Sequence, residues 1–198
     1  MRLFAALDLS GEHRRLLSSL RRPIPGVTWY PPETYHLTLR FIGDITSRPL
    51  LEEIDHALAS VEGAAFAIEP SGVGISTLPA RARLWAGVRP SDALARLQSR
   101  IETALRRAGL PAEKKRFQPH IALAALGGAP DAETIQWMQG HNLMRGTPAT
   151  IGHFTLFRSH RSHDAPVYES CAEYPFSGGI SAPAGMSVMP GEPGGFAF

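Results

Sequence analysis

Apolar and polar residues alternate along residues 35–41 (Tyr-His-Leu-Thr-Leu-Arg-Phe), a pattern typical of a half-buried β-strand. In such a strand His36 and Thr38 point to one face, whereas Leu37 and Leu39 point to the other. We therefore expect one face of this strand to pack into a core while the other is free to carry out chemistry.

The same periodicities predict an order of strands and helices along the chain. Helices are indicated by N-capping residues followed by apolar positions three and four apart, and strands by short apolar runs bounded by Gly and Pro. The predicted strands are residues 2–8, 27–30, 35–41, 66–75, 83–88, 117–123, 149–158 and 166–173, and the predicted helices are residues 10–22, 47–60, 91–109 and 131–140.

The order of elements in the first half of the chain is repeated in the second half. Residues 83–88 resemble residues 2–7, at an offset of 81 (83 − 2), and residues 117–123 take the place of residues 33–39, at an offset of 84 (117 − 33). We therefore expect an α+β fold that is bilobal and internally duplicated, with two antiparallel-type sheets flanking a central cleft and the helices outside.

This duplication predicts a single bilobal domain over residues 1–176, built from pseudo-repeats at about 1–80 and 81–176. His36 and His120 occupy equivalent positions in the repeats, so we expect them to face each other across the cleft. Residues 177–198 are rich in Gly, Pro, Ser and Ala without periodicity, which predicts a flexible tail.

Composition adds little to this picture but excludes some classes of protein. With 198 residues, 43% of them hydrophobic, the chain can bury a sizeable core. The 20 Lys and Arg against 18 Asp and Glu leave a net charge of only +2, which does not by itself argue for a nucleic-acid partner. The sequence contains no apolar run long enough to span a membrane and no secretory signal, so a cytoplasmic location is expected.

The only cysteine, Cys171, excludes an intrachain disulfide and fits a reducing compartment. Because it falls on a predicted strand, we expect it to be a buried, unreactive thiol.

Two histidines brought together from two strands can act as a general base and a general acid, since an imidazole both accepts and donates a proton near neutral pH. Phosphodiester chemistry needs such a pair, one member to activate water or a hydroxyl and the other to protonate the departing oxygen. A hydroxyl two residues after each histidine lies on the same face and can donate a hydrogen bond to a phosphoryl oxygen.

The segments His36-Leu37-Thr38-Leu39 and His120-Ile121-Ala122-Leu123 resemble the two HxTx tetrads of the 2H phosphoesterase superfamily. The flanking residues 29–33, 40–44, 117–119 and 156–159 are similar to its bacterial RNA 2′,3′-cyclic phosphodiesterases, historically called 2′-5′ RNA ligases. The resemblance covers roughly residues 1–175. It implies hydrolysis of a 2′,3′-cyclic phosphate to a 2′-phosphomonoester without metal, ATP or another cofactor, with one histidine as base and the other as acid.

The sequence does not decide which histidine is the acid; the working assignment makes His36 the acid and His120 the base. The chain departs from the family at Ala122, where the second tetrad has threonine, and at Ala125, where arginine is common. A lost hydroxyl donor costs on the order of 1–3 kcal/mol if nothing replaces it. We expect a slower enzyme, with the backbone of Ala122, a water molecule or Arg158 compensating.

Further residues are predicted to bind substrate. Phosphate or RNA-backbone contact is the functional hypothesis for four basic residues, Arg40, Lys115, Arg116 and Arg158, against the alternative of solvated surface charges. Phe41 or Trp29 can stack on a base, against the alternative of core packing.

A third HxTx match, at residues 153–156, is interpreted as structural, because His153 falls opposite Pro70 in the repeat alignment. His160, His163 and Asp164 do not have the spacing of a closed zinc site, so no metal is expected.

The expected partner is an RNA or cyclic nucleotide that carries a 2′,3′-cyclic phosphate, with no membrane and no obligate protein partner. Two alternatives remain open at this point. One is the reverse reaction, in which RNA ends are joined through a 2′-5′ linkage without ATP. The other is a non-catalytic protein that binds RNA ends, in which Ala122 marks a decayed site.

Overall fold

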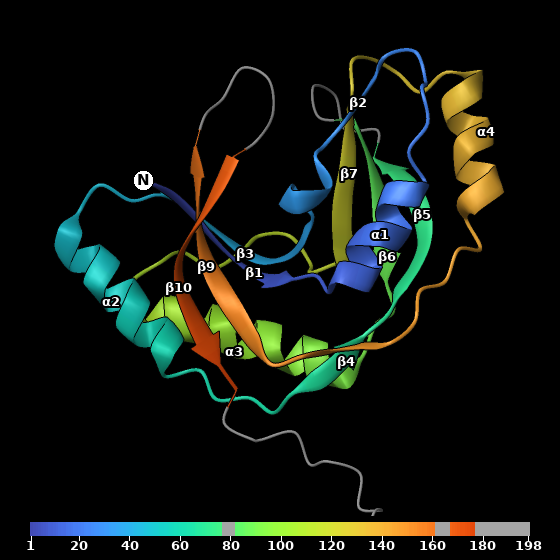
Figure 1. Ribbon diagram of the computed structural model, residues 1–198. Coiled ribbons are helices and arrows are strands. Elements are labelled where there is room, and N and C mark those ends of the chain that lie inside the picture. The colour runs from blue at the N-terminus through green and yellow to red at the C-terminus, as the bar shows by residue number, and fades with distance from the viewer. Residues whose placement is uncertain (77–81, 161–166, 177–198) are drawn as a thin grey trace, which may run out of the picture.

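The computed structural model describes residues 1–76, 82–160 and 167–176 (Figure 1). In this part of the chain four α-helices begin directly after a capping side chain that accepts a hydrogen bond from the backbone N–H three residues later, as expected at helix N-termini. The helices, with their caps, are α1 Gly11–Ser19 (Ser10), α2 Arg48–Ala59 (Ser47), α3 Asp92–Arg107 (Ser91) and α4 Ala132–His141 (Asp131), and a 3₁₀ helix, η1, covers Pro32–Thr34.

The strands form one large antiparallel sheet and a separate two-stranded sheet. In the large sheet the order is β10-β9-β1-β3-β7-β6-β5, and β2 also pairs with β7; β4 pairs with β8 in the small sheet. The strands are β1 Arg2–Asp8, β2 Val27–Trp29, β3 His36–Asp44, β4 Phe66–Ile68, β5 Pro70–Ser76, β6 Arg83–Val88, β7 His120–Leu126, β8 Ala149–Ile151, β9 His153–His160 and β10 Val167–Pro175.

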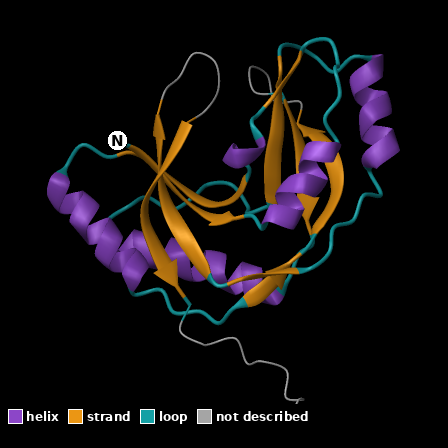
Figure 2. Ribbon diagram, viewed as in Figure 1, coloured by secondary structure: helices purple, strands orange, loops and turns teal. Residues whose placement is uncertain are grey.

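The predicted α+β class is confirmed, and the large sheet consists of two halves. Strands β10, β9, β1 and β3 form one half and β7, β6, β5 and β2 form the other, joined through the single residue pair Leu37–Ile121 (Figure 2). The outer strands are exchanged, because β5 from the first half of the sequence lies beside β6, and β9 from the second half lies beside β1. The small sheet pairs β4 of the first half with β8 of the second.

The helices cover the two halves of the large sheet separately. Helix α3 packs against β3 and α2, while α4 packs against β5. Helix α1 is tied to α4 by the buried indole of Trp137, whose Nε1 donates a hydrogen bond to the carbonyl oxygen of Leu20 at 2.8 Å. Helix α1 itself ends at Ser19, three residues before the predicted end at residue 22. No helix in the described residues is long and apolar enough to cross a membrane.

Each central strand contains a β-bulge at the same place. Thr38 pairs with Ala6 but Arg40 pairs with Ala5, so Leu39 is an extra residue in β3. In β7, Ala122 pairs with Trp85 and Ala124 pairs with Leu84, so Leu123 is the extra residue. It lies 84 positions after Leu39 (123 − 39) and is therefore its equivalent in the second repeat. A bulge reverses the alternation of the residues that follow it, so the side chains after Leu39 and Leu123 exchange faces.

The pairing corrects the alignment of the two N-terminal strands of the repeats. Asp8 is opposite His36, and Gly87 is opposite His120, so the structural offset between β1 and β6 is 79 (87 − 8) instead of 81. Because strand faces repeat every two residues, the shift leaves each side chain on its predicted face.

Cys171 is exposed, contrary to the prediction of a buried thiol. It lies where the pairing between β9 and the edge strand β10 is interrupted, since Ser170 pairs with Phe157 and Ala172 with Leu156. The predicted tail at residues 177–198 lies outside the described residues.

Candidate active site

The Leu37–Ile121 pair at the junction of the two halves brings the tetrads together. In an antiparallel pair, the residue before a paired position lies across from the residue that follows its partner, and the residue after it lies across from the residue that precedes its partner. His36 is therefore directed toward Ala122, and Thr38 toward His120, all four on one face of the sheet, which we call the histidine face. Leu37 and Ile121 point to the opposite face and are fully buried.

Both imidazoles are held in the same way. The Nδ1 atom of His36 lies 2.8 Å from the carbonyl oxygen of Thr34, and Nδ1 of His120 lies 2.7 Å from that of Gln118. A carbonyl oxygen only accepts hydrogen bonds, so Nδ1–H is the donor in each ring. Each Nε2 is thus the nitrogen left to exchange a proton with a substrate.

The two histidines differ in their surroundings. The His36 ring lies 4.8 Å from the ring of Phe4 and 4.9 Å, edge to face, from that of Tyr168. His120 is exposed, and its nearest aromatic neighbour is Trp85, with ring centroids 6.2 Å apart. Burial lowers the pKa of His36 below its usual value, although the carboxylate of Asp8 acts in the opposite direction.

Asp8 lies opposite His36 on β1 and is held in place by two side chains. Its Oδ1 is 3.3 Å from Nη2 of Arg14, and its Oδ2 accepts a hydrogen bond from Oγ1 of Thr155 at 3.1 Å. Thr155 belongs to the third HxTx match, whose His153 lies opposite Pro175 on β10, away from the junction of β3 and β7. That segment therefore supports Asp8, and its histidine does not join the pair.

On the other half of the sheet, Trp85 lies next to Ala122 in the pairing and extends over β5. A Cβ atom built on Gly74, the residue opposite Trp85, would lie 2.2 Å from the indole, so only glycine leaves room for the ring in this position. A Cβ on Gly87 would lie 2.6 Å from the carbonyl oxygen of Ser71. Gly74 thus leaves room for the indole of Trp85, and Gly87 for the close approach of the Ser71 carbonyl oxygen.

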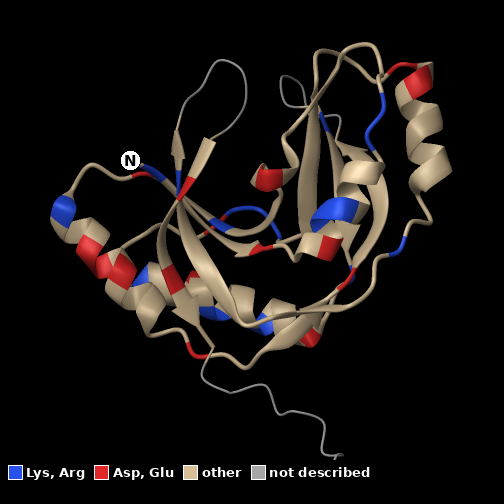
Figure 3. Cartoon of the chain, viewed as in Figure 1, with Lys and Arg blue, Asp and Glu red and all other residues tan. Residues whose placement is uncertain are grey.

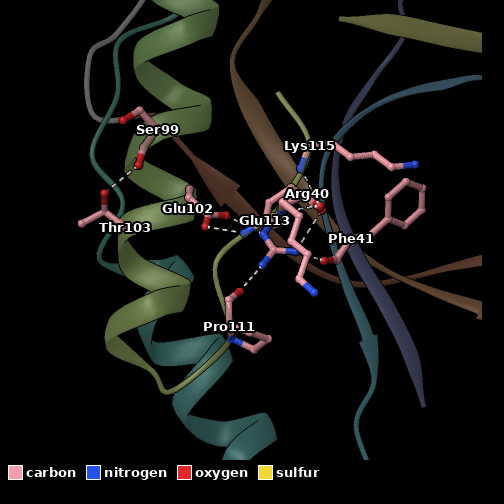
Figure 4. Close-up of polar contacts among 9 residues, drawn as sticks. Arg40, Phe41, Ser99, Glu102, Thr103, Pro111, Glu113 and Lys115 are labelled. Atoms are coloured by element: carbon pink, nitrogen blue, oxygen red, sulfur yellow. Dashed lines mark hydrogen bonds and ion pairs between the residues drawn. The ribbon is translucent and has the colours of Figure 1, made fainter. Parts of the chain in front are cut away.

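The structure corrects the prediction that Arg40 binds phosphate. The bulge at Leu39 turns Arg40 away from the histidine face, and its guanidinium is buried in ion pairs with Glu102 at 2.5 Å and Glu113 at 3.3 Å. It also donates hydrogen bonds to the carbonyl oxygens of Phe41 and Pro111 (Figure 4). Arg40 therefore joins β3 to α3 and to the loop before β7, and four of its five N–H donors are engaged in these contacts.

Arg158 is also turned away from the histidines. It pairs with Leu3 on β1, whereas its neighbour Phe157 pairs with Phe4 on the histidine face, and its guanidinium lies 3.9 Å from Glu169. This placement corrects the prediction that Arg158 compensates for Ala122.

Lys115 and Arg116 are exposed in the loop that leads into β7. The backbone N–H of Lys115 donates a hydrogen bond to Glu113 at 3.3 Å, so the same glutamate holds this loop and Arg40. Basic and acidic residues are interspersed over both halves of the molecule in the view of Figure 3. Contact of Lys115 or Arg116 with RNA stays a prediction.

Phe41 and Trp29 have different positions. The bulge places Phe41 on the histidine face, where its ring is 6.0 Å from that of Phe4 and 58% of the residue is exposed. Trp29 packs edge to face against Trp137 at 5.5 Å, and its Nε1 donates a hydrogen bond to the carbonyl oxygen of Arg22 at 2.7 Å. An exposed aromatic ring near His36 is suited to stacking on a base, whereas Trp29 is a packing residue.

Three residues on this face did not emerge from the sequence as site residues: Tyr168, Trp85 and Arg83. Tyr168 covers His36, and its hydroxyl pKa is raised by burial and by Tyr30 and lowered by the charge of Arg83. Trp85 and Arg83 had entered only as part of a repeated segment. Their signal was the alternation in residues 83–88, which places both on the same face as Gly87, opposite His120.

The described residues contain no group of three or more His, Cys, Asp or Glu side chains arranged to hold a metal ion. Nε2 of His160 lies 2.7 Å from Glu169. His163 and Asp164, the other members of the considered cluster, lie outside the described residues.

Comparison with known proteins finds chains of similar sequence and fold. The RNA 2′,3′-cyclic phosphodiesterase of Aeropyrum pernix is 40% identical over 166 residues, which cover 82% of this chain and 94% of that protein. The RNA 2′,3′-cyclic phosphodiesterase of Thermotoga maritima is 27% identical over 188 residues, covering 91% and 98%.

Among solved structures, Escherichia coli LigT complexed with 3′-AMP has a TM-score of 0.73 at 22% identity and covers 89% of this chain and 98% of its own, which supports the fold. The family model described as the 2′-5′ RNA ligase superfamily matches residues 10–163. The chain therefore belongs to the 2′-5′ RNA ligase superfamily.

Proposed function

We propose that this protein hydrolyses 2′,3′-cyclic phosphate ends of RNA to 2′-phosphomonoesters with His36 and His120 as the proton-transfer pair. The observation that carries the proposal is the matched arrangement of the two imidazoles. Each occupies the same position on a central strand, and each donates Nδ1–H to the carbonyl oxygen two residues earlier, so that both Nε2 atoms are available on one face. Relatives of this chain are named RNA 2′,3′-cyclic phosphodiesterases.

In the proposed step, His120 removes a proton from a water molecule as the water oxygen forms a bond to phosphorus. The bond between phosphorus and O3′ breaks, and His36 donates a proton to O3′. The product carries a 2′-phosphomonoester and a free 3′-hydroxyl, and the two histidines have exchanged protonation states. Thr38, directed toward His120, donates a hydrogen bond to a non-bridging oxygen as negative charge develops there.

The assignment of roles follows exposure. His120 is exposed, so water can reach it, whereas His36 is enclosed by Phe4 and Tyr168. The lowered pKa of His36 makes its protonated form a stronger acid than an ordinary imidazolium. A bound phosphate anion stabilises that protonated form, since opposite charges favour each other.

Substitution of each histidine tests the pair. His36→Ala and His120→Ala should each lower hydrolysis of adenosine 2′,3′-cyclic phosphate by about a hundredfold or more in the presence of EDTA, because one proton transfer is lost in each case. His153→Ala is the matched control and should keep wild-type activity. If the wild-type protein binds RNA ends but does not hydrolyse the cyclic phosphate, it is a non-catalytic binding protein. If EDTA abolishes hydrolysis by the wild type, the reaction depends on a metal ion.

A substrate with sulfur in place of O3′ separates the acid from the base. A thiolate leaves without prior protonation, because a thiol has a pKa of about 8.5. With this substrate His36→Ala should regain most of its activity and His120→Ala should not. The opposite result would exchange the two roles.

The same two proton transfers run in reverse join RNA ends through a 2′-5′ linkage. No observation in the described residues favours joining over hydrolysis. The ratio of joined to hydrolysed product from a nicked RNA substrate in the same assay measures the balance between the two directions.

A further inference from the structure

The second half of the site lacks two groups that its sequence family commonly supplies, a threonine at position 122 and an arginine at position 125. Both positions are alanine, and both lie on the histidine face, because the bulge at Leu123 brings Ala125 onto the same side as His120. Apart from His120, this face of β7 therefore has no side chain that can donate a hydrogen bond or a positive charge to a phosphoryl oxygen.

The neighbouring strand does supply such a group. Arg83 is paired directly with Ala125, as Trp85 is with Ala122 and Gly87 with His120. Directly opposed residues in an antiparallel pair project from the same face with Cβ atoms about 5 Å apart. The Arg83 side chain therefore starts at the same level along the sheet as a side chain at position 125, one strand further out.

The surroundings of Tyr168 place the charge of Arg83 close to the first half of the site. Tyr168 belongs to β10, in the other half of the sheet, and its ring lies 4.9 Å from that of His36. The charge of Arg83 nevertheless acts on the Tyr168 hydroxyl and lowers its pKa against the larger effect of burial. Arg83, on the histidine face of the second half of the sheet, is thus close enough to act electrostatically on Tyr168, the residue that covers His36 in the first half.

Arg83 is exposed, and within the described residues no carboxylate pairs with it. Arg89, beyond the other end of β6, forms an ion pair with Glu69 at 3.2 Å. A guanidinium that pairs with no carboxylate of the described residues can bind a phosphoryl group through two parallel hydrogen bonds and breaks no ion pair within that part of the chain to do so.

We infer that Arg83 binds a non-bridging oxygen of the reacting cyclic phosphate and takes the place of the missing arginine at position 125. The inference rests on the proposed function and identifies a residue of the same site. It predicts that the negative charge developing on phosphorus is stabilised from two sides, by Thr38 next to His120 and by Arg83 across from Ala125.

Steady-state hydrolysis of adenosine 2′,3′-cyclic phosphate tests this directly, because that substrate contains only the reacting phosphate. Arg83→Gln should lower kcat/KM by about 100-fold, in the range seen when one donor to a developing oxyanion is removed, and should weaken competitive inhibition by inorganic phosphate. Arg83→Lys should fall between Arg83→Gln and the wild type. Arg89→Gln, the matched control, should remain within about twofold of the wild type.

The double variant Arg83→Gln/Ala125→Arg tests the equivalence of the two positions. It should regain at least about tenfold in kcat/KM over Arg83→Gln, and failure to regain activity would overturn that equivalence. Arg83→Gln within threefold of the wild type, or a loss seen only with RNA that contains internal phosphates, would overturn the assignment to the reacting phosphate.

These outcomes are distinct from failure of the proposed function. If the wild type does not hydrolyse the cyclic nucleotide, the proposed function fails, and binding of Arg83 to phosphate is still measured by NMR. Inorganic phosphate should then shift the ring signals of His36 and His120 in the wild type but not in Arg83→Gln. Equal shifts in both proteins would overturn the inference.

Discussion

Arg40 follows the first tetrad directly and resembles a phosphate ligand in the sequence, yet the structure gives it a purely internal role. Its side chain is only 7% exposed, and it forms ion pairs with Glu102 and Glu113 and hydrogen bonds to two carbonyl oxygens. Arg40→Met keeps much of the side-chain volume and removes all these donors. It therefore isolates the ionic cluster shown in Figure 4.

The expected loss of stability can be estimated from the exposure of Glu102 and Glu113, the two carboxylates that lose their partner in Arg40→Met. Removing one partner of a fully buried ion pair costs about 3–5 kcal/mol, because an uncompensated charge remains. The side chain of Glu102 is 21% exposed and that of Glu113 is 34% exposed, so water solvates part of the unpaired negative charge. We expect the free energy of unfolding to fall by about 2–4 kcal/mol, which lowers Tm by about 10 °C in a chain of this size.

Thermal unfolding followed by circular dichroism measures this change, with Arg48→Ala as the control. Arg48 pairs with Glu52 one helical turn away but is 88% exposed, so its removal should shift Tm by about 1 °C or less. At a temperature where Arg40→Met is fully folded, its KM for cyclic nucleotide should stay within about threefold of the wild type, because Arg40 does not face the histidines. A KM raised more than tenfold with an unchanged Tm would refute this reasoning and restore Arg40 as a phosphate ligand.

Other variants test separate parts of the site. Ala122→Thr places a hydroxyl next to His36 and should raise kcat or leave it unchanged; a severe loss would contradict the placement of Ala122 beside His36 that follows from the Leu37–Ile121 pair. Tyr168→Ala exposes His36, so its ring pKa, measured by NMR titration, should rise toward about 6.5, while Tyr168→Phe should leave it low. The pKa of His36 in the folded state lies below its unfolded value, so the unfolded state binds more protons as the pH falls below about 6.5. Acidification therefore lowers the free energy of unfolding of the wild type. The decrease should be smaller in His36→Gln, which has no imidazole at this position. Gly74→Ala should displace Trp85, change its fluorescence and lower activity, whereas Gly152→Ala, where a Cβ atom has open space, should do neither.

Local patterns in the sequence predict most of the elements because each local signal has a local physical cause. The four helices begin after Ser10, Ser47, Ser91 and Asp131, whose side chains accept hydrogen bonds from the first turn. The two histidines follow from alternation and repetition together, and a repeat places equivalent residues at equivalent positions in a fold. The exchange of β5 and β9 between the halves of the sheet has no local signal, because it depends on which strand edges meet in three dimensions.

The errors in the predicted site have one common origin, the register of strands. Nothing in residues 35–41 marks Leu39 as an extra residue, so alternation places Arg40 with His36 and Phe41 with Leu37, and the structure has the reverse. Arg83 was missed for the same kind of reason. Its relation to Ala125 becomes visible only when β6 and β7 are paired, since the two residues are 42 positions apart (125 − 83).

The two halves of the site contribute different groups to phosphate binding. The Leu37–Ile121 pair explains why the absence of a threonine hydroxyl at Ala122 can be tolerated. In the antiparallel junction Thr38 serves the side of His120, while Ala122 adjoins His36, the ring enclosed by Phe4 and Tyr168. A hydroxyl lost there removes one hydrogen bond to the anionic phosphoryl group, whereas a guanidinium brings a positive charge and two parallel N–H donors. With Arg83 bound to the reacting phosphate, as inferred above from its pairing with Ala125, the charge of Arg83 offsets this loss as well. Replacing both Ala122 and Ala125 by the family's residues should accordingly restore the activity of Arg83→Gln more than either replacement alone.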